Sequence, residues 1–233
     1  MYSRANVPGI FSRSDNWWEY RVLADPPERR EGGGPKRYAV IELDGKPDAY
    51  AIYRHRPGWE QGSSVAKLEV LEALGATPQA TAEIWRYLLD VDWTAHITAW
   101  LLPIDHPLFF LLATPRRMRY RAGDGLWVRL VDVGAALSAR RYAADGRVVF
   151  EVADAFAEWN DGRWKLEGGE CTSTNDDPDL RLDVTALGSV YLGGFTFAQL
   201  QSAFRVEELR TGAIAEADAM FRSTHAPWCP EIF

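Results

Sequence analysis

Residues 29–34 carry one of two patterns in this sequence that could do chemistry. They satisfy the pattern R-x-x-G-x-G, in which backbone N–H groups at a helix N-terminus can cradle a pyrophosphate. That mechanism needs a strand before the pattern and a helix after it. Here Pro26 and Pro27 precede it, and the strand pattern Tyr38 to Leu43 follows. We therefore interpret residues 29–34 as a chance match in a loop and expect no cofactor-binding residues in this chain.

The second candidate is the end of the chain. Phe233 carries the terminal α-carboxylate, and a carboxylate held beside an amine can accept its proton. Pro227, Trp228 and Pro230 restrict the tail, and a stiff apolar tail tends to dock. Most terminal carboxylates lie in solvent, so the residues alone leave open whether this one is functional.

The other reactive residue types favour structural roles. The four histidines are scattered, and the acidic run Asp176 to Asp179 lacks the spacing of a calcium loop. Cys171 and Cys229 form no zinc pattern, which predicts no metal site and fits a reduced, cytoplasmic context. The chain contains no Walker A loop, no G-x-S-x-G elbow and no HExxH motif.

Composition and charge narrow the classes of function. The chain has 233 residues, enough for one large or two small domains. Its formal net charge of −7 argues against nucleic acid or an anionic membrane as partner. Apolar stretches such as residues 99–104 are too short to span a bilayer. The ten tryptophans favour packing over ligand contact.

The elements that would position these residues form a mixed α/β arrangement. Ser14 predicts a helix start, and residues 38–43 and 48–54 predict a hairpin. Thr77 followed by Pro78 predicts a second helix start between strands at 65–74 and 96–102. Beyond a boundary near residue 123, we expect strands at 126–131, 147–152, 163–167 and 180–183, and helices at 133–142, 185–192 and 214–221.

Several blocks of the sequence match one known family. Asp124 to Val133 begins a block that continues to Tyr142, and Leu187 to Gly193 forms another. The ends of the chain contribute further matches at Tyr2, Arg4, Pro8, Gly9, Arg13, Trp17 or Trp18, Pro227, Trp228, Cys229 and Phe233. These blocks resemble the Eis (enhanced intracellular survival) family of GNAT N-acetyltransferases, and the resemblance covers essentially the whole chain.

The resemblance implies a fold and a domain layout. Family members have an acetyl-CoA-binding GNAT domain, a second GNAT-like domain without cofactor and a domain resembling sterol carrier protein 2. We expect this α+β chain to hold the last two, at residues 1–122 and 123–233. The missing N-terminal GNAT domain is then a partner, and Met1 marks a cloning start, a truncated reading frame or a split gene. Family members form rings, which implies a homo-oligomer.

The resemblance also implies a mechanism. The α-carboxylate of Phe233 would be the general base for an amine substrate, of aminoglycoside or lysine type, with acetyl-CoA as cosubstrate of the full-length enzyme. Glu231 and Ile232 are the expected substrate-binding residues. The family often has an acidic residue just before the final Phe. Ile232 stands there in this chain, which bears on its preference for polycationic amines.

Three hypotheses for the chain's function remain open. In the first, the chain is the cofactor-free half of an acetyltransferase, shapes the amine pocket and has no transferase activity alone. In the second, it is a stand-alone carrier of lipid or another small molecule, because the sterol carrier fold can hold a lipid. In the third, it mainly builds an oligomer.

Overall fold

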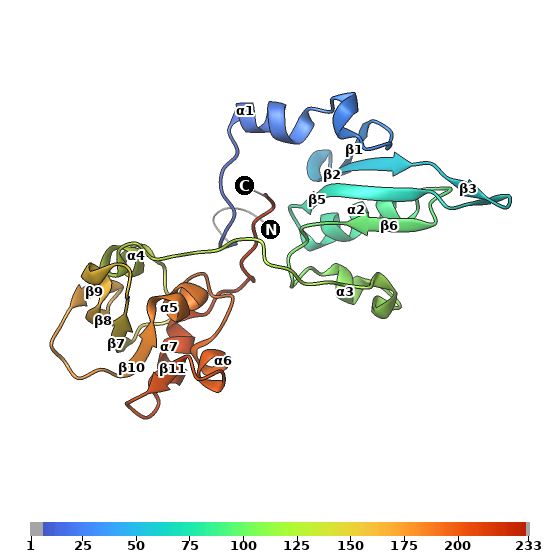
Figure 1. The fold of residues 1–233 in the computed structure, drawn as a ribbon. Helices are drawn as coiled ribbons and strands as arrows, with labels where there is room; N and C mark the ends of the chain where they lie inside the picture. Colours follow the sequence, from blue (N-terminus) through green and yellow to red (C-terminus); the bar gives the residue numbers. More distant parts are fainter. Residues whose placement is uncertain (1–6, 232–233) are drawn as a thin grey trace. The chain divides into compact units, whose positions relative to one another are not determined.

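The protein folds as two compact units along a chain whose residues 7–231 are described by a computed structural model. The first unit comprises the chain up to Gly125 together with Trp228 and the residues after it, and the second is Leu126–Pro227 (Figure 1). The expected boundary at residues 122 and 123 lies three residues before this division. The predicted domain at residues 123–233 includes the tail, and Trp228 in this tail is hydrogen-bonded to the first unit.

The first unit is built on a four-stranded sheet in the order β1-β2-β5-β6. A hairpin joins β1 (Lys36–Leu43) to β2 (Lys46–Arg56), as Asp44 and Gly45 predict, and both turn residues have positive φ. β2 pairs antiparallel with β5 (Lys67–Gly75), whereas β5 and β6 (His96–Ala99) are parallel. The parallel pair requires a crossover connection, and α2 (Pro78–Leu89) supplies it.

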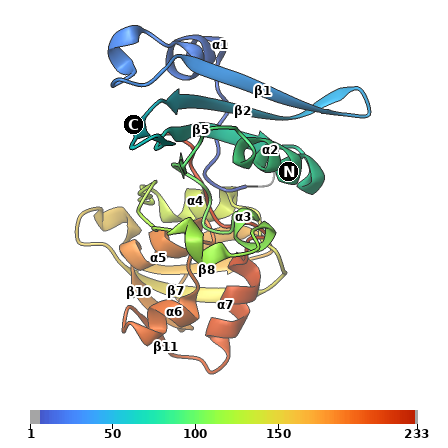
Figure 2. The ribbon, with the colours of Figure 1, turned by 90° about the vertical axis from the view of Figure 1, so that its right-hand side faces the viewer.

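Helix α2 covers one face of this sheet (Figure 2). Thr77 caps it by accepting the N–H of Ala80, and Pro78 occupies its first turn, which confirms the predicted helix start. Ile84, Trp85 and Leu88 share the buried side of the helix. They pack against every second residue along strands β2 and β5, namely Ala49, Ala51, Tyr53, Leu68 and Val70.

The N-terminal helix begins where Ser14 predicts but changes pitch. Ser14 accepts the N–H of Trp17 to cap α1 (Asp15–Trp17), which continues as the π-helical turn η1 (Trp18–Leu23). The helix ends before Pro26, as expected. The unit also contains η2 (Pro27–Arg29), β3 (Trp59–Glu60), β4 (Ser63–Ser64), α3 (Leu108–Leu111) and η3 (Pro115–Met118).

The second unit has a five-stranded sheet in the order β11-β10-β7-β8-β9. Its strands are β7 (Arg147–Ala153), β8 (Gly162–Glu167), β9 (Glu170–Ser173), β10 (Leu180–Asp183) and β11 (Val206–Glu208). Its helices are α4 (Val133–Ala139), α5 (Val184–Tyr191), α6 (Phe197–Ser202) and α7 (Ala213–Phe221), with a short turn η4 (Glu158–Asn160). The strands predicted at 147–152, 163–167 and 180–183 are confirmed, and β9 is one that the sequence analysis missed.

The predicted strand at residues 126–131 was wrong. The carbonyl of Val128 lies so close to α5 that a Cβ on Gly188 would be 2.8 Å from its oxygen. The buried Asn160 side chain donates to the carbonyls of Leu130 and Val131. The backbone of this segment therefore bonds to a side chain and packs on a helix, although its alternating sequence resembles that of a strand.

Two classes of feature are absent from residues 7–231. No helix in this described range is long and apolar enough to cross a bilayer. Within the same range, no three His, Cys, Asp or Glu residues come together in a way that could hold a metal ion. Asp179, from the acidic run that we judged not to be a calcium loop, instead accepts the N–H of Val149 and pairs with Arg210.

Candidate functional site

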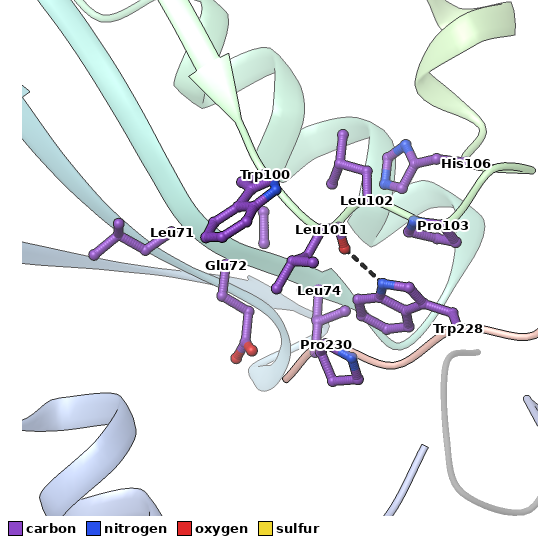
Figure 3. Close-up of a pocket in the computed structure, with 11 residues that line it drawn as sticks. Leu71, Glu72, Leu74, Trp100, Leu101, Leu102, Pro103, His106, Trp228 and Pro230 are labelled. Carbon is purple, nitrogen blue, oxygen red and sulfur yellow. Dashed lines mark hydrogen bonds between the residues drawn. The ribbon is translucent and has the colours of Figure 1, made fainter. Parts of the chain in front are cut away.

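The last described residues of the chain are fixed to the first unit. The indole N–H of Trp228 donates to the carbonyl of Leu101 at 2.5 Å (Figure 3). Its backbone N–H donates to the carbonyl of Pro8 at 2.9 Å. Gly9 passes directly over Trp228, because a Cβ at position 9 would lie 2.9 Å from the Trp228 carbonyl oxygen. Cys229 is buried next to this contact. The tail is therefore a packed segment.

The tail is attached a second time at Glu231, three residues after Trp228, and Arg13 is the partner. Its Nε donates to Glu231 at 2.6 Å, and its two terminal nitrogens donate to Glu72 at 2.9 and 2.5 Å. All three side chains are between 9 and 11% exposed. One guanidinium thus bridges a carboxylate of strand β5 and a carboxylate of the tail, with the fork geometry for which arginine is suited.

Aromatic side chains complete the surroundings of Arg13. The guanidinium lies 4.8 Å from the ring centroid of Trp18, and the Tyr50 hydroxyl donates to Glu72. Burial alone would lower the pKa of Arg13, but the bonds and charges of Glu72 and Glu231 raise it above its ordinary value. Burial and Glu72 likewise raise the pKa of Tyr50. Both shifts favour a cationic Arg13 and a neutral Tyr50.

A small cavity lies between the tail and the edge of the sheet. It has a volume of about 20 Å³, room for about one water, and its lining includes Glu72, Trp100, His106, Trp228 and Pro230 (Figure 3). His106 is buried there, and burial lowers its pKa to about 4. Its Nδ1 accepts the N–H of Leu108, which agrees with a structural role for this histidine.

The three residues predicted for the site fall into two groups. Phe233 and Ile232 lie outside the described residues. Glu231 is described, and its Oε1 accepts the Nε–H of Arg13. Sequence reasoning missed Glu72 and Tyr50. Arg13 was noted only as a matching residue near the start of the chain.

The junction between β5 and α2 is where a strand leads into a helix in the first unit, as the R-x-x-G-x-G mechanism requires. Its residues run from Gly75 to Pro78 and do not carry that pattern. Pro78 has no N–H, and the N–H of Ala80 donates to the Thr77 hydroxyl, which caps the helix. The N–H of Thr81 makes the first intrahelical bond, to the Thr77 carbonyl. Pro78 and Ala80 therefore offer no free donor to a bound anion.

A carboxylate also stands at this junction. The Thr77 hydroxyl donates to Asp48 at 2.6 Å, and the backbone N–H of Ala76 donates to the Asp48 carbonyl. A negative side chain at a helix N-terminus interacts favourably with the helix dipole, as a bound phosphate would. The Asp48 carboxylate therefore places a negative charge beside this helix end, which is unfavourable to a pyrophosphate at the same place.

The loop at residues 29–34 does not provide a substitute. Strand β1 follows its glycines, as expected, and no helix does. The N–H of Gly33 donates to the carbonyl of Arg30, and the N–H of Gly34 donates to the carbonyl of His55. These two amides serve the fold of the loop and its pairing with β2.

Two family models match the chain. The acetyltransferase (GNAT) domain matches residues 9–130, and the sterol carrier protein domain matches residues 133–230. GNAT acetyltransferases use acetyl-CoA as cosubstrate. The two matches meet close to the division between the two units at Gly125.

Known proteins resemble the chain over nearly all its length. An uncharacterized N-acetyltransferase of Streptomyces avermitilis is 45% identical over 97% of this chain and 56% of its own length. The N-acetyltransferase Eis of Mycobacterium tuberculosis is 32% identical over 94% of this chain and 52% of its own. The crystal structure of Eis1 from Mycobacterium abscessus superposes with a TM-score of 0.71 at 35% identity, over 86% of this chain and 51% of that one.

The chain spans about half the length of the curated relatives that it matches. The GNAT match lies within these 233 residues and covers more than half of them. The expectation of a GNAT-like layer followed by a sterol carrier domain is therefore confirmed at the level of the families. The chain belongs to the acetyltransferase (GNAT) domain family, in its Eis-like form with a sterol carrier protein domain.

Proposed function

We propose that this chain is the part of an Eis-like N-acetyltransferase that shapes the amine pocket and supplies the terminal carboxylate. Acetyl-CoA is then bound by a GNAT domain outside these residues, and the chain alone transfers no acetyl group. The N-terminus of α2 carries this proposal. Pro78 has no N–H there, the N–H of Ala80 is bonded to Thr77, and the Asp48 carboxylate lies beside them, which disfavours a pyrophosphate at this end of the helix.

The tail supports the second half of the proposal. In the reaction, a carboxylate takes a proton from the substrate ammonium, and the free amine attacks the thioester carbonyl carbon. A C–N bond forms, the C–S bond breaks, and the coenzyme leaves as a thiolate that takes up a proton. The α-carboxylate of Phe233 is the proposed base. The packing of Trp228 and Glu231 gives the chain end the fixed origin that such a base requires.

The substrate class follows from the same chemistry. We assign the substrates to primary amines of the aminoglycoside or lysine type, whose positive charge suits a chain with a formal net charge of −7. Ile232 stays a predicted substrate-binding residue, from its place next to Phe233 in the sequence. Glu231 would act by holding the tail, since its carboxylate is already bonded to Arg13.

Isothermal titration of acetyl-CoA into the 233-residue chain tests the proposal. We expect no heat of binding and no acetylation of a polyamine acceptor by this chain alone. A second titration uses the double variant Asp48→Asn, Thr77→Gly, which removes the carboxylate and the capping hydroxyl from the α2 N-terminus. Micromolar binding by the unaltered chain would overturn the proposal, because it would place a working cofactor site in residues 9–130.

A carrier function is the alternative, and the sterol carrier match at residues 133–230 is the observation in its favour. Against it, Phe150, Phe197 and Phe221 contact one another at the centre of the second unit, with centroids 5.0 to 6.1 Å apart. Native mass spectrometry distinguishes the two: a co-purifying lipid supports the carrier.

We also propose that the protein assembles as a homo-oligomer. Strand β1 lies at the edge of its sheet and exposes Tyr38 and Val40, an apolar strip of the kind that interfaces cover. Light scattering coupled to size-exclusion chromatography tests this, and a monomer at micromolar concentration would contradict it.

A further inference from the structure

Helix α3 turns apolar side chains outward. It buries only Leu108, although its sequence is apolar throughout. The three side chains that follow are exposed, Phe109 by 47%, Phe110 by 84% and Leu111 by 50%. The rings of the two phenylalanines contact each other, with centroids 5.6 Å apart. Exposed apolar side chains that gather in this way mark a surface that another apolar body covers.

The fold keeps these side chains outside because the inward positions nearby are filled. Leu108 belongs to the core of the first unit, and Leu112 and Met118 pack against this core. The His106 imidazole accepts the N–H of Leu108 and so fixes the start of α3. Helix α3 also contacts the turn η3 that follows it. Residues 108–121, which we call the α3 lobe, therefore form one anchored segment of the first unit (Figure 1).

The α3 lobe also carries a cluster of positive charge. It contains four arginines and no acidic residue. The arginines are all exposed: Arg116, Arg117, Arg119 and Arg121. Among residues 7–231, none of the four takes part in an ion pair, and the nearest paired arginines in the sequence are Arg86 and Arg129. The lobe thus has four guanidinium groups whose charge no described carboxylate neutralises by direct contact.

The composition of the chain does not reveal this local charge. The formal net charge of −7 suggests repulsion from an anionic surface. At physiological ionic strength, however, exposed charges act over only about 8 Å. The nearest acidic residues in the sequence, Asp105 and Asp124, lie outside the lobe. A surface that touches the lobe therefore experiences its arginines much more strongly than the acidic residues elsewhere in the chain.

We propose that the α3 lobe docks the protein on a lipid membrane with anionic head groups. The guanidinium groups donate paired N–H bonds to lipid phosphates, a geometry for which arginine is suited. Phe109, Phe110 and Leu111 enter the boundary between the head groups and the acyl chains. Such a segment lies on a membrane without crossing it, and no helix within residues 7–231 is long and apolar enough to cross one.

Charge complementarity and the apolar side chains together select this partner. A face that carries only positive charge fits a surface whose charge is uniformly negative, as that of anionic lipids is. A nucleic acid would satisfy the arginines through its phosphates, but it offers no hydrocarbon to Leu111. The aliphatic and aromatic side chains beside the arginines therefore favour lipid over nucleic acid.

Co-sedimentation of the 233-residue chain with lipid vesicles tests the proposal. We expect binding to vesicles of equal parts phosphatidylcholine and phosphatidylglycerol, and roughly tenfold weaker binding to pure phosphatidylcholine. Sodium chloride should weaken the binding to the anionic vesicles, because salt screens the arginines. Equal binding to both kinds of vesicle, or binding to neither, would overturn the proposal.

Two charge variants test whether the arginines of the lobe are responsible. The double variant Arg116→Gln, Arg117→Gln should bind anionic vesicles roughly twentyfold more weakly. Its control, Arg29→Gln, Arg37→Gln, removes two charges from exposed positions of the same unit and should bind within about twofold of the unaltered chain. Equal losses would show an effect of total charge instead of a site. Because all four side chains are exposed, an unchanged melting temperature is expected and shows that each variant is folded.

A further pair of variants tests the apolar half of the site. We expect roughly tenfold weaker binding of anionic vesicles by Phe110→Ser. Its control in the same unit is Tyr20→Ser, at a side chain of η1 that is 61% exposed, and this variant should bind as the unaltered chain does. A parallel titration with polyuridylate distinguishes nucleic acid from lipid. An unchanged vesicle affinity in Phe110→Ser, or polyuridylate binding as tight as vesicle binding, would show that the choice of lipid is wrong.

None of these measurements involves acetyl transfer. The outcome is therefore independent of the proposed function.

Discussion

The indole N–H of Trp228 donates to the carbonyl oxygen of Leu101 across a sequence separation of 127 residues. Leu101 has a φ of +55°, a left-handed conformation that is uncommon for a residue with a branched side chain. This conformation aims the carbonyl at the tail instead of along the extended direction of β6. The bond therefore connects an unusual backbone geometry at one end of the sheet to the docking of the chain end.

Replacement of Trp228 by Phe should weaken the first unit. Phe keeps most of the apolar contact but leaves the Leu101 carbonyl without its donor, which costs about 1–2 kcal/mol in the free energy of unfolding. Urea denaturation measures this loss. Trp127→Phe is the control, since Trp127 is 83% exposed, and its effect should stay within about 0.5 kcal/mol. Equal effects of the two changes would mean that the Leu101 bond contributes nothing.

Replacement of Gly9 by Ala should cost more than the same change at Gly62. Both glycines have positive φ, at +93° and +81°, so both variants carry the strain of a left-handed alanine, about 1 kcal/mol. Only at Gly9 would the new Cβ also strike the Trp228 carbonyl, whereas nothing lies within 4 Å at Gly62. We expect a larger fall in melting temperature for Gly9→Ala than for Gly62→Ala. Only Gly9→Ala should speed the alkylation of the buried Cys229 thiol by iodoacetamide. Similar melting temperatures would argue against close packing of residue 9 on the tail.

The burial of His106 should make the first unit less stable in acid. Because its pKa is lowered to about 4 from 6.5, protonation favours the unfolded state. The contribution is fully present above about pH 6.5 and is lost as the pH falls toward 4, by up to about 3 kcal/mol. His106→Asn offers an amide oxygen near the position of Nδ1 and should flatten the stability profile between these pH values. His96→Asn, at an exposed position, should leave the profile unchanged.

Removal of the Asn160 side chain should destabilise the second unit. This fully buried amide accepts the N–H of Val133 and donates to the carbonyl of Val131 and to Asp154. Asn160→Ala leaves several buried groups without partners, for a loss of about 2–4 kcal/mol in the free energy of unfolding. Asn175→Ala, at an exposed loop position, should have little effect. A small loss for Asn160→Ala would show that water replaces the missing amide.

Local signals in the sequence predicted much of the fold. Ser14 and Thr77 are caps whose side chains satisfy backbone donors three residues later, and such bonds depend on neighbours alone. The segment 126–131 shows the limit of this reasoning. Its apolar alternation suits a strand, but whether it joins a sheet depends on α5 and Asn160, which lie far away in sequence.

The site itself could be predicted only in part. The end of the chain was recognisable as a candidate because of its prolines, Trp228 and the resemblance to a family. The residues that hold it were not, since Arg13 meets Glu72 and Glu231 over separations of 59 and 218 residues. A charge that pairs at such distances leaves no periodic trace in the sequence. Glu231 illustrates the consequence: the resemblance to the family implies a substrate-binding role for it, and nothing in the sequence indicates its bond to Arg13.

The return of Trp228 to the first unit has a consequence for the newly made protein. Translation proceeds from the N-terminus, so the ribosome releases all of Leu126–Pro227 before the tail emerges. The second unit therefore has its complete set of residues first, although its synthesis begins later. Until residues 228–231 appear, the nascent first unit has a Leu101 carbonyl without its Trp228 donor and an Arg13 with only one of its two carboxylate partners.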